Sequence, residues 1–131
     1  MELLLSKAYR KLFTVKNLEE KSESWELLVI ENESNIPESL EGNEAVLNGY
    51  CNDVEIIDFP FRGKVMYITF RRRKWKESNE VHSVSNSYHF HKKGMKTTDE
   101  FGDFLKSLPA EEYLEFFRAF PSLRHLQQEN I

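Results

Sequence analysis

The chain has 131 residues, of which 40% are hydrophobic, 13% aromatic and 31% charged, with a formal net charge of −4. This composition argues against a disordered chain, and the length suits one domain with a single core but no large catalytic domain beside it. The sequence contains no apolar run near the roughly 20 residues that span a bilayer, and it has one cysteine, Cys51. We therefore expect no secretory leader, no membrane association and a single cytoplasmic domain over residues 1–131.

The first half of the chain predicts one helix followed by strands. Apolar residues recur at helical spacing over residues 2–13, which predicts an amphipathic helix. After a polar stretch, a run of β-branched and aromatic residues predicts a strand at about residues 25–31, and the polar residues 32–43 predict a loop. Residues 45–50 and 54–59 are predicted to be the two strands of a hairpin.

A long strand is predicted over residues 64–75, antiparallel to the strand before it. Pro60 breaks that earlier strand, and Gly63 supplies a turn residue able to adopt a positive φ angle. The first half of the long strand is apolar on both faces, whereas the second half projects bases to both sides. Residues 81–92 alternate in character and are predicted to return beside it, forming a β-ribbon with the basic cluster at its tip.

Two helices are predicted to close the chain. Thr97 and Glu100 form a capping-box signature before one apolar face, while Pro109 and Pro121 bound the second helix. Residues 121–131 are predicted to be a frayed polar tail. The expected fold class is therefore α+β, with an N-terminal helix, a small antiparallel β-sheet carrying a long basic β-ribbon, and two C-terminal helices.

Motifs for enzymatic chemistry are absent from the sequence. Phosphate-loop, dinucleotide, hydrolase and zinc-protease signatures do not occur, which argues against an enzyme. His89 and His91 would share one strand face in the predicted ribbon, but a zinc site needs three or four ligands and no C-x-x-C pair is present. We therefore expect no cofactor and no metal, with these histidines on the surface beside the ribbon.

The basic cluster is the strongest functional signal. Residues 61–96 carry ten Lys and Arg against two acids, whereas residues 1–60 and 97–131 carry more acids than bases. Basic side chains neutralise phosphates and release counterions, and arginine and aromatic rings stack on bases. The same pattern also describes a solvated strand end that is balanced by the protein's own acids.

Residues 58–75, DFPFRGKVMYITFRRRKW, and residues 93–105, KGMKTTDEFGDFL, resemble the N-terminal region of bacterial insertion-sequence transposases of the ISAon type. The resemblance continues in three upstream segments, residues 12–15, 25–31 and 35–38, and so spans most of residues 3–108. Related transposases carry a zinc ribbon at this place. This chain lacks the cysteine pairs of that ribbon, and aromatic packing is expected to hold the structure instead.

The resemblance implies a non-enzymatic DNA-binding domain that recognises the terminal inverted repeats of a mobile element. Such a domain acts in transposition, a form of DNA recombination, with a separate catalytic transposase subunit or domain. The residues expected to bind double-stranded DNA are Arg62, Lys64, Arg71, Arg72, Arg73, Lys74, Trp75 and Lys76. If about five of these basic side chains contact phosphates, the logarithm of the DNA affinity falls with the logarithm of the salt concentration at a slope near −4 to −5.

Two other functions stay open from the sequence. The first is a protein–protein interaction module, in which the aromatic C-terminal helices present more apolar surface than one core needs. The rings concerned are Phe101, Phe104, Phe116, Phe117 and Phe120. The second is a degenerate transposase remnant that folds without binding DNA.

Overall fold

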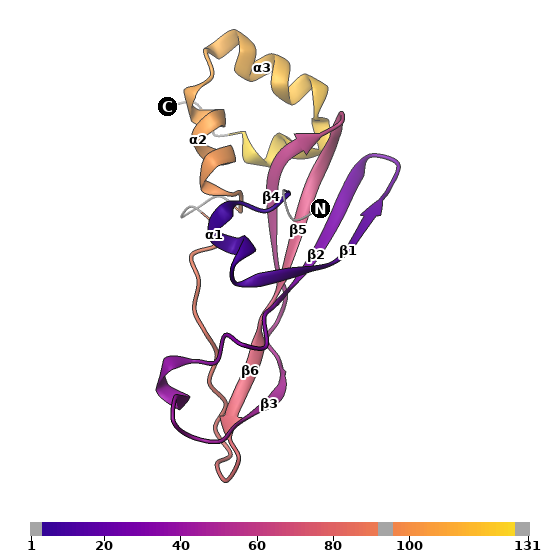
Figure 1. The fold of residues 1–131 in the computed structure, drawn as a ribbon. Coiled ribbons are helices and arrows are strands. Elements are labelled where there is room, and N and C mark those ends of the chain that lie inside the picture. The colour runs from indigo at the N-terminus through magenta and orange to yellow at the C-terminus, as the bar shows by residue number, and fades with distance from the viewer. Residues whose placement is uncertain (1–3, 92–95, 128–131) are drawn as a thin grey trace.

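The computed structural model describes residues 4–91 and 96–127 and combines strands with helices (Figure 1). The elements in chain order are α1 (Lys7–Arg10), β1 (Phe13–Glu20), β2 (Ser24–Glu31), the 3₁₀ helix η2 (Glu38–Leu40), β3 (Ala45–Tyr50), β4 (Val54–Phe61), β5 (Lys64–Arg71), β6 (Arg73–Glu77), α2 (Asp99–Ser107), α3 (Ala110–Ala119) and the 3₁₀ helix η3 (Pro121–Leu126). The predicted α+β class is confirmed.

The main sheet has four strands in the order β1–β2–β5–β4. β1 pairs antiparallel with β2, and β4 pairs antiparallel with β5, whereas the central strands β2 and β5 run parallel. The sheet is therefore mixed, and the prediction of an antiparallel sheet is wrong for its centre. The reason is that two local hairpins lie side by side with their inner strands pointing the same way.

β3 and β6 form a second, two-stranded antiparallel sheet beyond one end of the main sheet (Figure 1). Arg72 alone separates β5 from β6, so the long strand predicted over residues 64–75 passes from the first sheet into the second. The predicted hairpin of residues 45–50 with residues 54–59 is wrong. β3 pairs with β6 and β4 with β5, so the irregular segment of residues 51–53 connects two different sheets.

Each face of the main sheet has its own apolar core. Phe70 and Ile68 point into a core with Phe13 and Phe90, which α1 helps to cover. Val65 points to the opposite face, where it packs with residues of α2, α3 and η3. The first half of the long strand is therefore buried on both faces, as predicted.

Aromatic rings fill the centre of the first core. The ring of Phe70 lies 4.6 Å from that of Phe90, 4.9 Å from that of Tyr9 and 5.2 Å from that of Phe13, measured between centroids. Tilted and edge-on aromatic contacts at these separations contribute about 0.5–1.5 kcal/mol each beyond the burial of area. Aromatic packing thus attaches the segment around Phe90 to the sheet.

The N-terminal segment differs from its prediction. α1 comprises four residues, and the chain enters β1 at Phe13, so the helix predicted over residues 2–13 is wrong in extent within the described residues. Leu5 and Phe13 are 2% and 3% exposed because they insert into the sheet core rather than line a helix face. No strand was predicted for the residues of β1. A β-bulge between Val15 and Asn17 interrupts the alternation of apolar and polar residues that identifies a strand in a sequence.

The predicted returning arm at residues 81–92 is wrong for its described part, residues 81–91. These residues form no strand, and Val84 makes an isolated bridge to Trp75 with backbone N···O distances of 2.8 and 2.6 Å. Tyr88 and Phe90 pack into the first core instead. His89 and His91 consequently share no strand face, and residue 92 lies outside the described residues.

The two C-terminal helices are confirmed as α2 and α3. Thr98, one residue beyond the predicted Thr97, caps α2 by accepting a hydrogen bond from the Phe101 N–H at 3.2 Å. η3 replaces the predicted frayed tail up to residue 126, because Leu123 is fully buried and Leu126 is 7% exposed. None of the described helices is both long and apolar enough to cross a membrane.

The turn between β4 and β5 generates a prediction about stability. Arg62 and Gly63 have φ angles of 50° and 78°, in the left-handed region. No atom lies within 4 Å of a Cβ built on Gly63, so Gly63→Ala should lower the free energy of unfolding by about 1 kcal/mol through backbone strain alone. Arg62→Asn should raise it by a few tenths of a kcal/mol, since asparagine tolerates this conformation.

Urea unfolding of both variants measures these changes. The urea concentration at the transition midpoint should fall for Gly63→Ala and rise for Arg62→Asn. The slope of the free energy of unfolding against urea concentration should not change in either variant. A Gly63→Ala protein as stable as the wild type would contradict the turn conformation.

Candidate functional site

The eight predicted site residues lie at three places along the run from β4 to β6. Arg62 and Lys64 are at one end of β5, and residues 74–76 are on β6 beyond its other end. Because strands rise about 3.3 Å per residue, the eight-residue strand β5 separates these two groups by about 26 Å. Residues 71–73 lie between them, where the main sheet ends and the second begins. The structure therefore divides the predicted site.

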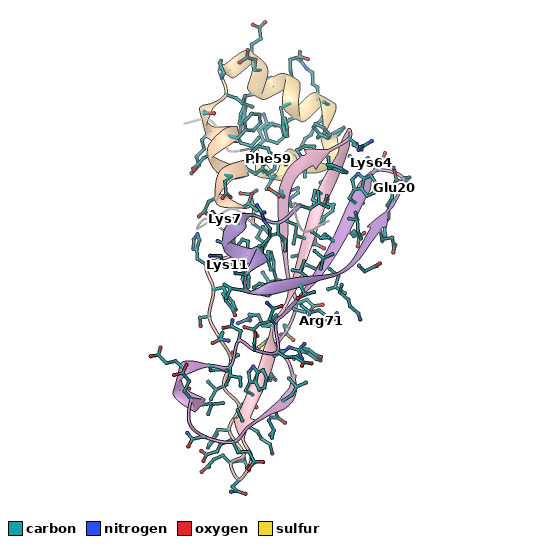
Figure 2. All side chains as sticks on the ribbon, in the orientation of Figure 1. Lys7, Lys11, Glu20, Phe59, Lys64 and Arg71 are labelled. Carbon is teal, nitrogen blue, oxygen red and sulfur yellow. The ribbon has the colours of Figure 1, made fainter. Side chains whose placement is uncertain are left out.

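Lys64 is held at the turn end of the main sheet. Its ammonium group donates hydrogen bonds to the Glu20 carboxylate at 2.8 Å and to the Lys21 carbonyl at 2.7 Å (Figure 2). The same group lies 5.7 Å from the ring centroid of Trp25. These contacts attach β5 to the tip of the β1–β2 hairpin, so Lys64 has a structural role. Arg62 is exposed, with its guanidinium 5.5 Å from the ring centroid of Phe61.

Arg71 is paired with an acid of the same chain at a partly exposed position. Its Nε and Nη2 atoms each donate to a carboxylate oxygen of Asp53 at 3.0 Å, in a bidentate arrangement. The hydrogen bonds to Asp53 and the charge of that carboxylate raise the pKa of Arg71. Planar guanidinium–carboxylate forks are geometrically specific. Arg71 thus joins the end of β5 to the residue that precedes β4.

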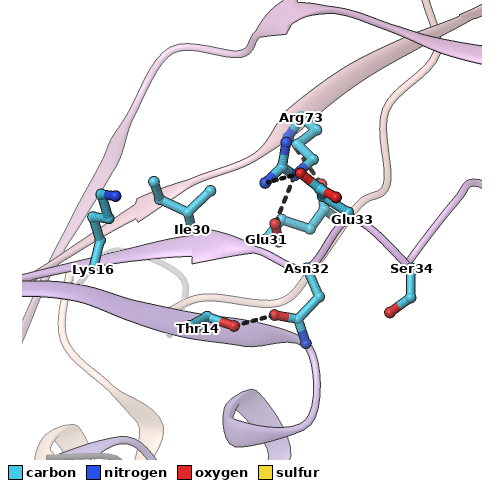
Figure 3. Close-up of a pocket in the computed structure, with 8 residues that line it drawn as sticks. All are labelled: Thr14, Lys16, Ile30, Glu31, Asn32, Glu33, Ser34 and Arg73. Carbon is cyan, nitrogen blue, oxygen red and sulfur yellow. Dashed lines mark hydrogen bonds and ion pairs between the residues drawn. The ribbon is translucent and has the colours of Figure 1, made fainter.

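Arg73 is bound to the end of β2 by both its backbone and its side chain. Its N–H donates to Glu31 Oε1 at 2.9 Å, and its Nε donates to the Glu31 carbonyl oxygen at 2.8 Å (Figure 3). Its guanidinium carbon lies 5.8 Å from the ring centroid of Tyr50. With 13% of its side chain exposed, Arg73 does not project freely into solvent as the sequence predicted.

Glu31 is a fully buried carboxylate. Its Oε2 atom accepts hydrogen bonds from Asn86 Nδ2 at 3.0 Å and from the Tyr88 hydroxyl, in addition to the contact between Oε1 and the backbone of Arg73. A buried carboxylate without such donors would be strongly destabilising. These four residues, Glu31, Arg73, Asn86 and Tyr88, form what we call the Glu31 junction. The junction ties β2, β6 and residues 78–91 together.

Sequence reasoning missed Glu31, although a signal for it exists. Leu27, Val29 and Glu31 alternate along β2, and the first two point into the core. The third inward position therefore carries an acid, which predicts a buried carboxylate in need of donors. The identity of those donors could not follow, because Arg73 and Tyr88 lie 42 and 57 residues further along the chain.

Arg72 has no acidic partner among the described residues. Its Nη1 donates to the Asn86 carbonyl oxygen at 3.2 Å, and its Nε is buried without a hydrogen-bond partner in the part of the chain that the structure describes. Arg72 thus packs against the segment that also supplies the donors of the Glu31 junction. The three consecutive arginines are all engaged within the protein.

β6 presents different residues on its two faces. Trp75 is 6% exposed, whereas its neighbours Lys74 and Lys76 lie on the opposite face, the first exposed and the second half-buried. Within residues 4–91 and 96–127, neither lysine forms an ion pair. On the paired strand β3, Asn48 is exposed and donates to Ser83 Oγ at 2.5 Å. Within the described residues, the second sheet therefore presents two unpaired ammonium groups beside neutral polar groups and one half-buried acid, Glu77, the last residue of β6.

His89 pairs with the first residue of α2 at the surface. Its Nε2 lies 3.0 Å from each carboxylate oxygen of Asp99, which joins residues 78–91 to the start of α2. Across the described ranges, no three His, Cys, Asp or Glu side chains are grouped so that they could hold a metal ion.

No protein-family model, curated protein or solved structure matches the chain. The site is therefore interpreted from its own geometry.

The Glu31 junction generates a prediction about alkaline pH. Burial, followed by the hydrogen bond to Glu31, raises the pKa of Tyr88 above its ordinary value of 10.0. Burial and the nearby charges of Asp99 and Glu100 raise the pKa of Tyr9 to about 12. The unfolded chain loses both phenol protons near pH 10 while the folded protein keeps them, so stability falls as the pH rises from about 10 toward the folded-state pKa values.

Tyr88→Phe should lower the free energy of unfolding at about pH 8 by about 1–2 kcal/mol, because Glu31 loses a donor. It should also make the decline between about pH 10 and pH 11.5 less steep. Urea unfolding across this range measures both effects, and Tyr50→Phe, at an exposed ring, is the matched control. A Tyr88→Phe protein whose stability declines as steeply as that of the wild type would contradict the buried phenol–carboxylate contact.

Proposed function

We propose that this chain is a double-stranded DNA-binding module and that the second sheet, β3 with β6, contacts the DNA. The observation that carries the proposal is the pair Lys74 and Lys76, which lie without acidic partners in the described structure on a two-stranded ribbon beyond the main sheet (Figure 1). A major groove about 12 Å wide admits a two-stranded β-ribbon. Lysines on such a ribbon reach phosphates, which supply most of the sequence-independent affinity.

The arginines have a different role in this proposal. Arg71 is neutralised by Asp53, and Arg73 is bound through its backbone and Nε to Glu31. These contacts hold β6 at the end of β5 and thereby set the direction in which the two-stranded sheet of β3 and β6 extends. Lys74 and Lys76 account for a salt slope of about −2, smaller than the slope expected when the whole cluster meets phosphates.

The resemblance of residues 58–75 to ISAon-type transposase N-terminal regions supports a more specific form of this function. In that form the module recognises the terminal inverted repeats of an insertion sequence. It acts in transposition beside a separate catalytic transposase subunit or domain, in the cytoplasm, and is not itself an enzyme.

The double variant Lys74→Gln/Lys76→Gln tests the proposal. It should weaken binding to a duplex of about 20 base pairs by about tenfold at low salt and reduce the magnitude of the log–log salt slope by about 2. Fluorescence anisotropy over a series of salt concentrations measures both. Lys11→Gln/Lys106→Gln removes the same charge from exposed positions outside the second sheet and should keep the wild-type slope.

Equal slopes for the Lys74/Lys76 variant and the wild type would contradict the proposed contact surface. Element-end and shuffled duplexes in the same titration separate recognition of the repeats from general DNA binding.

A protein-binding role is the second candidate, favoured by an exposed aromatic pair. Phe59 on β4 and Phe104 on α2 are 40% and 37% exposed, with ring centroids 5.4 Å apart. Phe101 and Phe117, which the sequence also offered as surface, are buried in the second core. The resemblance makes the catalytic transposase chain the expected occupant of this pair.

Phe59→Thr/Phe104→Gln should abolish co-elution with a catalytic transposase chain of the ISAon type, because the exposed rings are removed, and should leave DNA affinity unchanged. Size-exclusion chromatography with and without DNA measures this, and the Lys74/Lys76 variant should show the opposite pattern. Retention of the complex by the aromatic variant would contradict this candidate.

A further inference from the structure

The face of the second sheet that carries Lys74 and Lys76, which we call the lysine face, also carries neutral polar side chains. Val46 on β3 pairs with Lys76 on β6, so these two side chains lie on the same face. Asn48 follows Val46 by two residues along the strand and therefore points to the lysine face as well. The β3–β6 pairing has a β-bulge here, and Gly49, with a φ angle of 87°, adopts the left-handed conformation of its extra residue. Asn48 thus lies beside the lysines on an exposed surface.

Ser83 reaches the lysine face from the other side of β6. Val84 forms a bridge with Trp75, so these two residues share the opposite face of the sheet. Ser83, one residue earlier, therefore points to the lysine face. The Asn48 amide donates a hydrogen bond to Ser83 Oγ at 2.5 Å, and both residues are exposed. Because the two residues come from opposite sides of β6, this hydrogen bond crosses β6 on the lysine face.

The amide of Asn48 keeps two groups for a further partner. The hydrogen bond to Ser83 uses one of its two N–H groups. Among the residues that the structure describes, the second N–H and Oδ1 have no hydrogen-bond partner. An amide N–H and the carbonyl oxygen beside it match the N7 acceptor and the N6 donor that adenine presents in the major groove. The bond to Ser83 also fixes the amide in one orientation, which lowers the entropy that binding would cost.

We propose that Asn48 reads an adenine in the major groove of DNA and that Ser83 positions its amide. This inference rests on the proposed DNA-binding function and gives that function a sequence-dependent part. A ribbon that brings Lys74 and Lys76 to the phosphates turns the same face, and with it Asn48, toward the base edges. The lysines supply affinity without sequence information, whereas a bidentate contact to a base discriminates between sequences. Asn48 is therefore a specificity-determining residue and Ser83 a positioning residue.

Selection of duplexes from a random-sequence library tests the assignment. The wild type should select a site with an adenine whose preference disappears in Asn48→Ala. That variant should bind the selected duplex about tenfold more weakly than the wild type does. Its salt slope should equal that of the wild type, because both lysines are unchanged. Asn17→Ala removes an exposed asparagine on β1 and is the matched control, which should change neither quantity.

A modified base and two further variants test the contact at single groups. Replacing that adenine by 7-deazaadenine removes the N7 acceptor and keeps base pairing, so wild-type binding should weaken about fivefold and Asn48→Ala binding should not change. Asn48→Asp keeps the shape of the side chain and should shift the preference at this position to cytosine, whose N4 amino group donates to a carboxylate. Ser83→Ala should lower the preference for adenine about threefold without changing the salt slope.

The outcomes separate this inference from the proposed function. If the Lys74/Lys76 variant loses affinity while Asn48→Ala keeps the wild-type base preference, adenine reading is wrong and DNA binding stands. The same conclusion follows if Asn48→Ala weakens binding to all duplexes equally, or if the wild type binds duplexes without any base preference. If the wild type binds no duplex, both are wrong.

Discussion

The fully buried Glu31 carboxylate is the constraint on which the arrangement of the two sheets depends. A carboxylate in an apolar interior must have hydrogen-bond donors. Its donors come from β6, through the backbone of Arg73, and from the connection after β6, through Asn86 and Tyr88. Satisfying this one group therefore sets where β6 leaves the main sheet. The position of the ribbon toward any partner follows from that.

The basic residues 71–76 are one continuous run in the sequence, but in the fold the arginines and the lysines have different roles. Arginine suits fixed, bidentate or multiply bonded contacts, and Arg71 and Arg73 make them with Asp53 and Glu31. Lysine is a flexible point charge, and Lys74 and Lys76 remain unpaired within the described residues. The change from arginine to lysine along the run thus coincides with the change from scaffold to available surface.

The sequence predicted elements with local causes and missed those with distant ones. The β4–β5 hairpin and α2 follow from Gly63 and from the capping Thr98, one residue from the predicted cap, and both act within a few residues. The pairing of β3 with β6 has no local signal. The acids that engage Arg71 and Arg73 lie 18 and 42 residues away, so the loss of these arginines from the predicted DNA surface could not be read from the sequence.

Nuclear magnetic resonance of the arginine Nε–H groups, assigned with Arg71→Lys and Arg73→Lys, tests most directly whether these arginines belong to the scaffold and not to the DNA-contacting surface. The structure predicts that both Nε–H groups exchange with solvent more slowly than those of an unbonded arginine in the free protein, because Asp53 and the Glu31 carbonyl accept their hydrogen bonds. Arg73, whose side chain is 13% exposed, should exchange more slowly than Arg71, whose side chain is 35% exposed. Both groups should keep this slow exchange when DNA is added. Rapid exchange of both groups in the free protein, with protection only after DNA is added, would contradict the scaffold role and return the arginines to the contact surface.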